Sequence, residues 1–429
     1  MLIKSDKIFK ENLGELLENG SKDENPRPKY ETDGVPAHSI YINQVFEKYD
    51  LSKNEFPFSL ARPIAVKTGI KEILAIYQGQ ENTRESFERY GVSWWKNWFN
   101  EMDNLGTAYP YNLESHRTNE SIRTKVRVEP RIVDTKYAEF SWDTYKTQNL
   151  DSYKDLTYYT QEELDILYDI WIEKINMTIG FDGKSFIHKD WHSFKQFLLD
   201  LPYLPQFHLA REDKFVDWEL SPLYYKSNAF SKDTCVFLSK SDIEEYMSMD
   251  NEDPNNTLRY ELSRNQVNEL IRSLKEDKYS RRHITSFWNW QTSPRKSLQE
   301  CAYETIWSCR NVKGETYLDM TLIQRSSDTL VAGHINKLQY CALMLMIAST
   351  CGYKVGKFVH FIQNFHVYDR HMEQLEIILA RLDELDKKEC VQPILALKNK
   401  KDFYNITIDD FEVLYYDPIK EQLTFELAV

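Results

Sequence analysis

The chain has few cysteines for its length, six in 429 residues, and no two of them form a C-x-x-C pair. A scaffold held by disulfides needs a denser set, so reduced thiols are expected. No apolar run approaches the roughly eighteen residues that a membrane helix needs, and the N-terminal stretch lacks the apolar region of a signal peptide. We therefore expect a cytoplasmic protein without a membrane-spanning segment.

Basic clusters are also missing. Lys and Arg number 54 against 67 Asp and Glu, the net charge is -13, and the basic residues are spread along the chain. Such a distribution argues against direct nucleic-acid binding, although a few local arginines would suffice for a small anionic ligand. Apolar residues are plentiful: 41% of the chain is hydrophobic and 14% aromatic, enough to bury one large core or two ordinary ones.

The pattern of residues changes along the chain. In residues 57–98 and 263–429, apolar and polar residues follow the regular patterns of globular segments. The stretch between them has a less regular pattern and is rich in tyrosine and charged residues. We interpret residues 115–262 as an insertion region that separates an N-terminal part, 1–114, from a C-terminal part, 263–429, of one catalytic domain. The fold class expected is α+β, with one mixed sheet packed with helices and a large insertion.

Two helices are indicated in the first half of the chain. Apolar residues at helical spacing predict a helix that carries Glu72 and ends at Gly79 as its C-cap. A second helix should begin after Thr160, because Glu163 three residues later completes a capping box, and should stop at Gly180.

The C-terminal part predicts a hairpin followed by a central helix. Residues 304–326 read as two strands joined by a turn at Lys313-Gly314. An almost wholly apolar helix should span 336–352, followed by a strand at 357–368 and an amphipathic helix at 369–385.

Cys301 differs from the other cysteines in its surroundings. Cys309, Cys341 and Cys351 lie within apolar patterns and are expected to be small buried hydrophobes. Cys301 follows a polar, acidic lead-in at the mouth of a predicted strand, so both a nucleophile and a core thiol remain possible.

Several arginines could bind a doubly charged phosphate. Arg281 and Arg282 are adjacent, and Arg325 with Ser326 adds a third guanidinium and a hydroxyl; each guanidinium can pair bidentately with phosphate oxygens. Taken alone, the first pair could equally be an exposed basic pair and the second group an ordinary strand end.

An amide and two ring side chains complete the polar set. Asn336 can donate and accept at once, as reading the O4 and N3–H edge of uracil requires, but it could also cap the helix that begins there. His366 and Tyr368 lie two residues apart on one face of an extended segment, as sugar-hydroxyl binders would. His188 and His192 lack a third ligand and a glutamate in the H-E-x-x-H position, so no metal site is expected.

Six segments together resemble the thymidylate synthase family, in the family's order. They are residues 56–99 with "WWKNW", "LGTAYPYN" at 105–112, the stretch 265–289 with "SRR", "QRSSDTLVAGHIN" at 324–336, "NFHVYDRHMEQ" at 364–374, and the tail 410–429 ending in "LAV". The resemblance implies a homodimer that transfers a one-carbon unit from 5,10-methylenetetrahydrofolate to dUMP, with no metal.

The resemblance also implies roles for individual residues. Cys301 would attack C6 of the base, with nearby arginines lowering its pKa; Glu72 would organise proton transfer; and Tyr109 would lie near the C5 proton. The nucleotide ligands implied are Arg281, Arg282, Gln324, Arg325, Ser326, Asp328, Asn336, His366 and Tyr368, the first two reaching the partner's site. The folate-facing residues implied are Trp95, Trp98, Leu298, Asp328, Val331 and Val429.

The chain departs from the family pattern near the folate. Ala302 stands where the family usually has histidine, and Ile335 where it has phenylalanine. The N-terminal phosphate arginine has no in-register counterpart, with Arg27 and Lys29 as candidates. These departures resemble the phage hydroxymethylases of the family, so we expect 5-hydroxymethyl-dUMP as product; alternatives are a thymidylate synthase making dTMP and dihydrofolate, and a catalytically silent binding protein.

Overall fold

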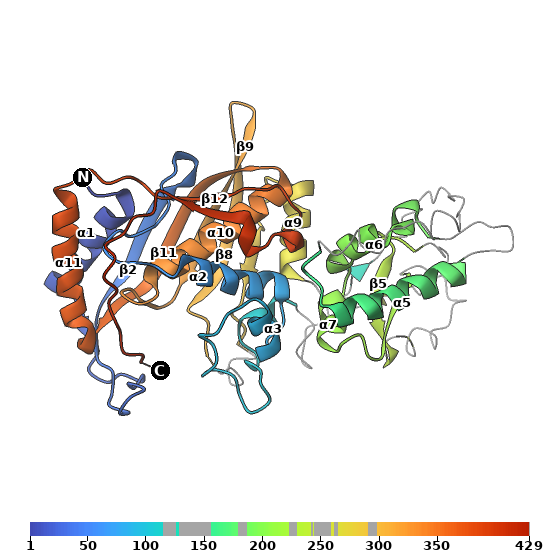
Figure 1. The fold of residues 1–429 in the computed structure, drawn as a ribbon, viewed down its shortest axis with the longest axis horizontal. Coiled ribbons are helices and arrows are strands. Elements are labelled where there is room, and N and C mark those ends of the chain that lie inside the picture. Colours follow the sequence, from blue (N-terminus) through green and yellow to red (C-terminus); the bar gives the residue numbers. More distant parts are fainter. Residues whose placement is uncertain are drawn as a thin grey trace. The chain divides into compact units, whose positions relative to one another are not determined.

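The computed structural model describes residues 1–114, 126–127, 156–178, 187–222, 230–241, 243, 259–260, 265–290 and 298–428. The chain divides into two compact units: Met1–Asn112 together with Leu270–Val429, and Leu113–Glu269 (Figure 1). Over the described ranges, no helix has the length and apolar character to cross a membrane.

The first unit is built on a mixed seven-stranded sheet. Its strands are β1 (Ser21–Lys22), β2 (Ser39–Asp50), β7 (Ile284–Ser286), β8 (Ala302–Val312), β9 (Glu315–Gln324), β10 (Ser327–Asp328) and β11 (Lys354–Tyr368). The order is β1-β2-β11-β9-β8-β7, and β10 pairs with β11. β11 runs antiparallel to β2 and parallel to β9, so the prediction of an α+β fold with one mixed sheet is confirmed.

The predicted hairpin is present as β8 and β9. Lys313 and Gly314 form its turn, with φ values of 53° and 85°, and such left-handed conformations favour glycine. The antiparallel register pairs Ala302 at the start of β8 with Gln324 at the end of β9. The residue before β8 and the residue after β9 therefore lie side by side.

The central helix is α10 (Gly333–Cys351), which packs against α2 (Val66–Leu74) and against β9 and β11 (Figure 1). Most of its side chains are buried, as its nearly continuous apolar sequence predicts. The sheet face beneath it is apolar, with Leu318 and Leu322 of β9 and Phe358 of β11 fully buried. α10 therefore forms the middle of the core.

Several predicted boundaries move. α10 begins at Gly333, three residues before the predicted start, and ends at Cys351, with Gly352 as its C-cap at φ 72°. α2 continues into a π-helical turn, η2 (Ala75–Gly79), and Gln80 takes the left-handed conformation, so the prediction of Gly79 as C-cap is wrong. β11 begins three residues before the predicted strand, and a 3₁₀ turn, η8 (Asp369–His371), precedes α11 (Met372–Asp386).

A second apolar cluster lies beside the sheet, where α1 (Lys4–Asn19) and α11 run next to each other (Figure 1). The remaining elements of the first unit are η1 (Leu51–Lys53), α3 (Arg84–Arg89), β12 (Ile394–Leu397), η9 (Phe403–Asn405), η10 (Ile408–Asp410) and β13 (Phe411–Leu414). Two elements cross the division between the units, namely η3 (Tyr109–Leu113) and α9 (Gln266–Glu276).

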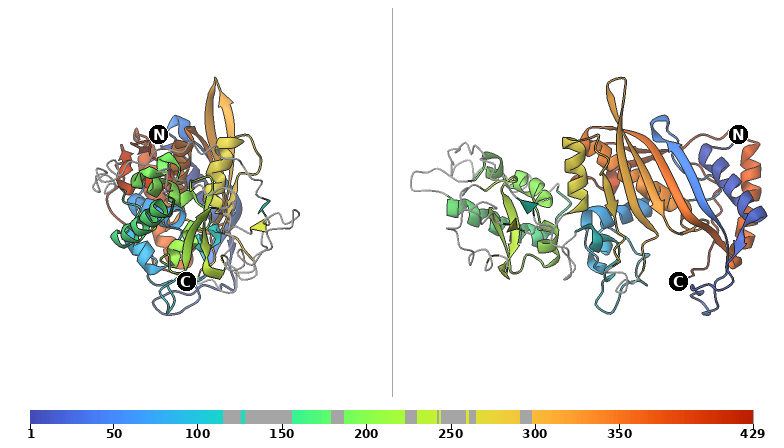
Figure 2. Two further views of the ribbon diagram at one scale, coloured as in Figure 1. Left: turned by 90° about the vertical axis from the view of Figure 1, so that its right-hand side faces the viewer. Right: turned by 180° about the vertical axis from the view of Figure 1, so that it is seen from behind.

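Large apolar side chains lie on the sheet face opposite α10. The register places Phe46 beside Phe361, Phe361 beside Ile323, and Ile306 beside Ile284, in three strand pairings of the sheet. Phe46 is 62% exposed, Ile284 46% and Ile306 37%. In the rear view of Figure 2 the strands that carry them face the viewer.

In its described residues, the second unit combines helices with two two-stranded sheets, β3 with β6 and β4 with β5. Its elements are β3 (Val126–Arg127), α5 (Gln161–Thr178), η5 (Lys189–His192), α6 (Phe194–Asp200), η6 (Leu201–Tyr203), α7 (Phe207–Glu212), β4 (Trp218–Pro222), β5 (Cys235–Ser239) and β6 (Arg259–Tyr260). The predicted capping box of α5 is confirmed, because the N–H of Thr160 donates to Glu163 at 2.7 Å and the N–H of Glu163 donates to the Thr160 hydroxyl at 3.2 Å. The predicted stop at Gly180 lies outside the described residues.

Candidate active site

Cys301 lies directly before β8 and meets Arg325, which directly follows β9. The backbone N–H of Arg325 donates to the Cys301 carbonyl at 2.8 Å, and its Nη2 lies 3.6 Å from the Cys301 Sγ. The same guanidinium donates to the carbonyls of Gln299 and Glu300, each at 2.9 Å. These bonds hold a cation beside the thiol.

Tyr109 reaches the backbone of the same cysteine from another part of the chain. Its hydroxyl accepts a hydrogen bond from the Cys301 N–H at 3.2 Å. The backbone N–H of Tyr109 donates to the buried carboxylate of Glu300 at 2.9 Å, and Asn112 donates to the same oxygen at 3.3 Å. Tyr109 has φ 43°, an uncommon conformation for a side chain of its size, and the Glu300 contacts stabilise it.

Burial sets the direction of the Cys301 pKa. Removal of the thiolate from water raises the pKa, and Glu300 adds to this, while the positive charges of Arg325 and Arg27 lower it. The net shift is upward from the usual value of a thiol. The expectation that nearby arginines would lower the pKa is right about their contribution and wrong about the net direction.

Arg27 is one of the two candidates for the N-terminal phosphate arginine that the sequence left unassigned. Its charge lowers the pKa of both Cys301 and Tyr368. Of the two candidates, Arg27 is therefore the one whose charge acts on residues of the site. Lys29, the other candidate, lies in a backbone bridge with Pro36.

Glu72 projects from α2 and is held by uncharged donors. Trp95 Nε1 donates to one carboxylate oxygen and Gln339 Nε2, from α10, donates to the other, with Trp94 as a further donor. Burial raises the pKa of Glu72 to about 7, and these hydrogen bonds oppose the rise. Glu72 is therefore poised to gain or lose a proton near neutral pH.

Asn336 lies in the first turn of α10 and is not its cap. Ala332 is the N-cap residue and accepts the backbone N–H of Asn336 at 2.9 Å, so the capping alternative is wrong. The Asn336 side chain donates from Nδ2 to Gln339 Oε1 at 3.0 Å and accepts at Oδ1 from Gln324 Nε2 at 3.3 Å. Sequence reasoning missed Gln339, although its position one helical turn after Asn336 was a usable signal.

β10 and β11 bring a third group together. Their parallel register places Asp328 beside His366, and burial raises the pKa of Asp328 to about 7. Burial lowers the pKa of His366 to about 4, so this imidazole is neutral at pH 7. The rings of His366 and Tyr368 are 5.0 Å apart, and burial raises the pKa of Tyr368 to about 12.

Most predicted folate-facing residues lie close to these groups. Trp95 is 6% exposed, and its ring packs edge-on against Tyr109 with centroids 5.2 Å apart. The backbone N–H of Trp98 donates to the Trp95 carbonyl at 2.9 Å. The Val331 N–H donates to the Asp328 carboxylate at 3.3 Å.

Three predicted residues lack such contacts, and a fourth cannot be placed. Leu298 is half-buried three residues before Cys301, and Val429 lies outside the described residues. Arg281 and Arg282 are exposed between α9 and β7, and within the described ranges neither makes a hydrogen bond or ion pair. The structure therefore does not join these two arginines to Cys301 within one chain.

The histidine pair of the second unit is not arranged like a metal site. His188 caps the short turn η5, where its Nδ1 accepts from the N–H of Asp190 at 3.3 Å, so it does not share an α-helix with His192. In the part of the chain that is described, no group of three or more His, Cys, Asp or Glu side chains could hold a metal ion.

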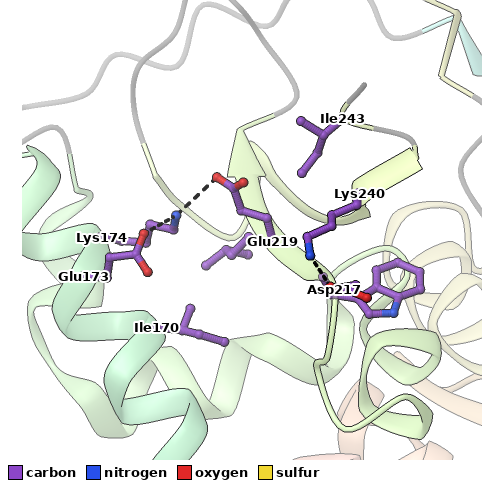
Figure 3. Close-up of a pocket in the computed structure, with 9 residues that line it drawn as sticks. Ile170, Glu173, Lys174, Asp217, Glu219, Lys240 and Ile243 are labelled. Atoms are coloured by element: carbon purple, nitrogen blue, oxygen red, sulfur yellow. Dashed lines mark hydrogen bonds and ion pairs between the residues drawn. The ribbon is translucent and has the colours of Figure 1, made fainter. Parts of the chain in front are cut away.

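The second unit contains a cavity of about 330 Å³ (Figure 3). Its lining includes Lys174, whose amine lies 3.1 Å from Glu173 and 3.4 Å from Glu219. Lys240 pairs with Asp217 at its other side. None of the residues predicted to carry the chemistry lines this cavity.

The comparisons with known proteins agree with this geometry. The model of a family described as thymidylate synthase matches residues 7–175 and 219–429. The chain belongs to the thymidylate synthase family. It is 30% identical over 432 residues to the thymidylate synthases of Streptococcus pneumoniae strains 70585 and P1031, with all of each chain covered. The thymidylate synthase of Streptococcus suis strain 05ZYH33 is 29% identical with the same coverage.

A solved structure shows the same thymidylate synthase fold. The thermostable thymidylate synthase A of Bacillus subtilis superposes with a TM-score of 0.58 at 23% identity, over 99% of each chain. Members of the family are one-carbon transferases that use methylenetetrahydrofolate as co-substrate, so the prediction of an enzyme of this class is confirmed. The hydroxymethylase branch stays a prediction.

Proposed function

We propose that this thymidylate synthase family member transfers a one-carbon unit from 5,10-methylenetetrahydrofolate to C5 of dUMP through a covalent adduct on Cys301. The observation that carries the proposal is the Arg325 guanidinium, 3.6 Å from the Cys301 thiol and fixed by two backbone carbonyls. A cation in this position stabilises the thiolate, which is the nucleophilic form, and can also bind an anionic substrate.

In this proposal, Glu72 and Tyr109 carry out different proton transfers. The Cys301 sulfur bonds to C6 of the base, and the electron pair of the ring double bond moves toward O4, where protonated Glu72 donates. C5 thereby becomes the nucleophile that accepts the one-carbon unit, which the bound folate supplies. Tyr109, whose hydroxyl accepts from the Cys301 N–H, would lie near the C5 proton as it leaves.

The phosphate would be bound from both subunits of a homodimer. Arg27, Arg325 and Ser326 belong to the same chain as Cys301, whereas Arg281 and Arg282 would come from the partner subunit. Both of the latter are exposed and precede β7, an edge strand of the sheet face with exposed apolar side chains. An apolar face of this kind supports an isologous interface between two copies.

Mixing two inactive variants tests the shared site. A Cys301→Ser chain and a chain with Arg281→Ala and Arg282→Ala should each lack activity, and the mixture should regain it after subunit exchange, because the hybrid dimer contains one intact site. A mixture as inactive as its components, with subunit exchange demonstrated by mass, would contradict a shared phosphate site.

The remaining nucleotide contacts follow from the same arrangement. Asn336 would read O4 and N3–H of uracil, and Gln324 supports its amide. His366 and Tyr368 would bind sugar hydroxyls from β11, with Asp328 alongside on β10. Trp95, Trp98, Leu298, Val331 and Val429 would face the folate.

For the product we propose dTMP. Hydride transfer needs the reduced folate ring close to the C5 methylene, and a small misplacement costs about a hundredfold in rate. Trp95 is fixed by its bond to Glu72 and by its ring contact with Tyr109, which gives a firm wall. The relatives named thymidylate synthase support the same product.

One observation favours the second candidate, 5-hydroxymethyl-dUMP. Ala302 is buried and apolar where the family usually has histidine, and Ile335 replaces phenylalanine. These replacements reshape the pocket, and water could then capture the C5 methylene in place of a hydride. A change of both residues back to the family's types should then shift the product toward dTMP.

Product analysis decides between the candidates. Purified protein is incubated with dUMP and methylenetetrahydrofolate. The mass of the nucleotide product is measured by mass spectrometry, and formation of dihydrofolate is followed by its ultraviolet absorbance. A methylated nucleotide with equimolar dihydrofolate supports dTMP; a hydroxymethylated nucleotide without dihydrofolate supports the second candidate. If neither forms, and a fluorinated dUMP gives no adduct that survives denaturation, the chain is a silent binding protein.

We also propose that residues 115–262 are an insertion into a catalytic domain formed by 1–114 and 263–429. The described residues with predicted catalytic roles, Glu72, Tyr109 and Cys301, all belong to the first compact unit. Replacement of the insertion by a short flexible linker should leave a folded protein that still binds dUMP. Loss of folding would contradict this division.

A further inference from the structure

Five polar side chains behind the proposed base site form one continuous line of hydrogen bonds. His360 Nε2 lies 2.9 Å from Gln324 Oε1, and Gln324 Nε2 lies 3.3 Å from Asn336 Oδ1. Asn336 Nδ2 lies 3.0 Å from Gln339 Oε1, and Gln339 Nε2 donates to Glu72. Three amides thus stand in series between an imidazole and a carboxyl group.

The line has a fixed direction because the Ser326 carbonyl and, in its ionised form, the Glu72 carboxylate can only accept. Gln324 Nε2 also donates to the Ser326 carbonyl at 2.8 Å, so the oxygen of Gln324 must face His360. At the other end the Glu72 carboxylate accepts from Gln339, so the oxygen of Gln339 must face Asn336. Asn336 lies between them, with Oδ1 forced toward Gln324 and Nδ2 toward Gln339.

The direction matters because an amide can read two different bases. Uracil presents a donor at N3 and an acceptor at O4, whereas cytosine presents an acceptor at N3 and a donor at N4. An asparagine side chain that turns by half a rotation exchanges its donor and its acceptor, and so can satisfy either base. Asn336 alone therefore does not select uracil; its orientation does.

We propose that Gln339 is a specificity-determining positioning residue, which locks the amide of Asn336 in the orientation that reads uracil. The inference rests on the proposed function, in which Asn336 faces the pyrimidine. Gln339 supplies the acceptor that holds Asn336 Nδ2, and Glu72 holds Gln339 in turn. The group that organises the proton at O4 thus also fixes the reader of the same base edge.

Two variants of Gln339 separate this role from simple packing. Gln339→Met keeps the volume of the side chain and removes both hydrogen bonds, so the amide of Asn336 can turn. Gln339→Glu keeps an acceptor for Asn336 Nδ2 and removes the donor to Glu72. Gln78→Met is the matched control, because Gln78 is also a buried amide of the same unit and donates to the carbonyls of Phe403 and Ile406.

The measurement is release of tritium from C5 of labelled dUMP and dCMP, with kcat/KM for each. A site built for one hydrogen-bond pattern rejects the other by orders of magnitude, so Gln339→Met should lower the dUMP-to-dCMP ratio by about 10- to 100-fold. Gln339→Glu should keep the ratio within about threefold, while the second carboxylate moves the alkaline limb of the kcat profile to higher pH. Gln78→Met should change neither quantity.

The outcomes distinguish the inference from the function on which it rests. If wild-type protein prefers dUMP and the Gln339→Met variant is equally selective, Gln339 does not fix the orientation of Asn336. The proposed function would then stand without this inference. A dUMP-to-dCMP ratio that falls by about tenfold or more in Gln339→Glu would overturn it as well, and this comparison needs only the wild type, so it remains should the methionine variant fail to fold. Wild-type protein that uses neither nucleotide contradicts the proposed function, and the inference fails with it.

Discussion

The candidate active site contains two buried acidic groups, and the charge of their neighbours differs. On one side the thiol of Cys301 faces a cation, Arg325, at 3.6 Å. On the other side, the donors to the carboxyl group of Glu72 that the structure describes are uncharged: the indoles of Trp95 and Trp94 and the amide of Gln339. Burial raises both pKa values, and the nature of the neighbours decides what each group can do next.

The difference matches two kinds of chemistry. A fixed positive charge favours an anion at the thiol, as a nucleophile and an anionic substrate both require. Neutral donors leave the pKa of Glu72 at about 7, so the carboxyl group exchanges a proton near neutral pH. Removal of one group at a time tests whether the two sides have these separate roles.

The largest effect is expected from Cys301→Ser on the thiol side. A serine hydroxyl ionises far less than a thiol and is a harder nucleophile, so transfer to C5 should fall by a factor on the order of 10³ or more. The change is nearly isosteric, and thermal unfolding should move little. The measurement is dUMP turnover with methylenetetrahydrofolate.

Cys309→Ser is the matched control for this variant. Cys309 is half-buried on the same strand, and burial raises the pKa of its thiol to about 11. Its replacement should leave turnover within about twofold of wild type, since a thiol with so high a pKa forms little thiolate at neutral pH. Equal losses in the two variants would remove the assignment of Cys301 as nucleophile.

On the carboxyl side, Glu72→Gln should lower kcat by about 10²-fold, because an amide cannot transfer a proton. The pKa of about 7 gives the pH dependence: Glu72 is protonated below it, so wild-type activity should fall as pH rises through that value. Thiolate formation at Cys301 rises with pH, and the wild-type profile should be bell-shaped. The variant should lose the alkaline fall.

An exposed glutamate provides the comparison for Glu72. Glu88 of α3 is exposed, and Glu88→Gln should leave both kcat and the shape of the profile unchanged. A Glu72→Gln variant that keeps the alkaline limb would show that another group carries the proton, and Asp328, with a pKa also raised to about 7, would be the next to examine.

Asn336→Asp should change selectivity more than rate. A carboxylate at this position still accepts from Gln324 but cannot donate to O4 of uracil, whereas it can accept from the exocyclic amine of cytosine. The ratio of kcat/KM for dUMP to that for dCMP should fall by about 100-fold. An unchanged ratio would leave Asn336 as a link between Gln324 and Gln339 only.

Local patterns predicted the thiol side of the site well. Alternation of apolar residues and the Lys313-Gly314 turn define the hairpin, and an antiparallel hairpin necessarily brings the residue before its first strand beside the residue after its second. Cys301 and Arg325 occupy those two positions. Their meeting is thus a consequence of local sequence.

The carboxyl side depends on packing between distant segments, which no local pattern reports. Glu72 and Gln339 meet because α2 lies close against α10, and Gly69 permits this approach: a Cβ there would lie 3.0 Å from Ile335 Cγ2 and 3.2 Å from Gln339 Cγ. The same reason explains the misjudged Cys301 pKa, since the neighbouring charges were readable from the sequence and the depth of burial was not.

The smallest predicted effect isolates the charge that distinguishes the two sides. Arg325→Gln keeps a hydrogen-bonding side chain and removes the positive charge that lowers the Cys301 pKa. A higher pKa means less thiolate at any pH below it, and each pKa unit lowers the thiolate fraction tenfold, so alkylation of Cys301 at pH 7 should slow by about tenfold. Peptide mass spectrometry follows alkylation at this cysteine alone.

Arg310→Gln, which removes an arginine paired with Asp319 on the same hairpin, should leave the rate unchanged. Equal rates in wild type and Arg325→Gln would mean that the cation serves the substrate and contributes nothing to the nucleophile.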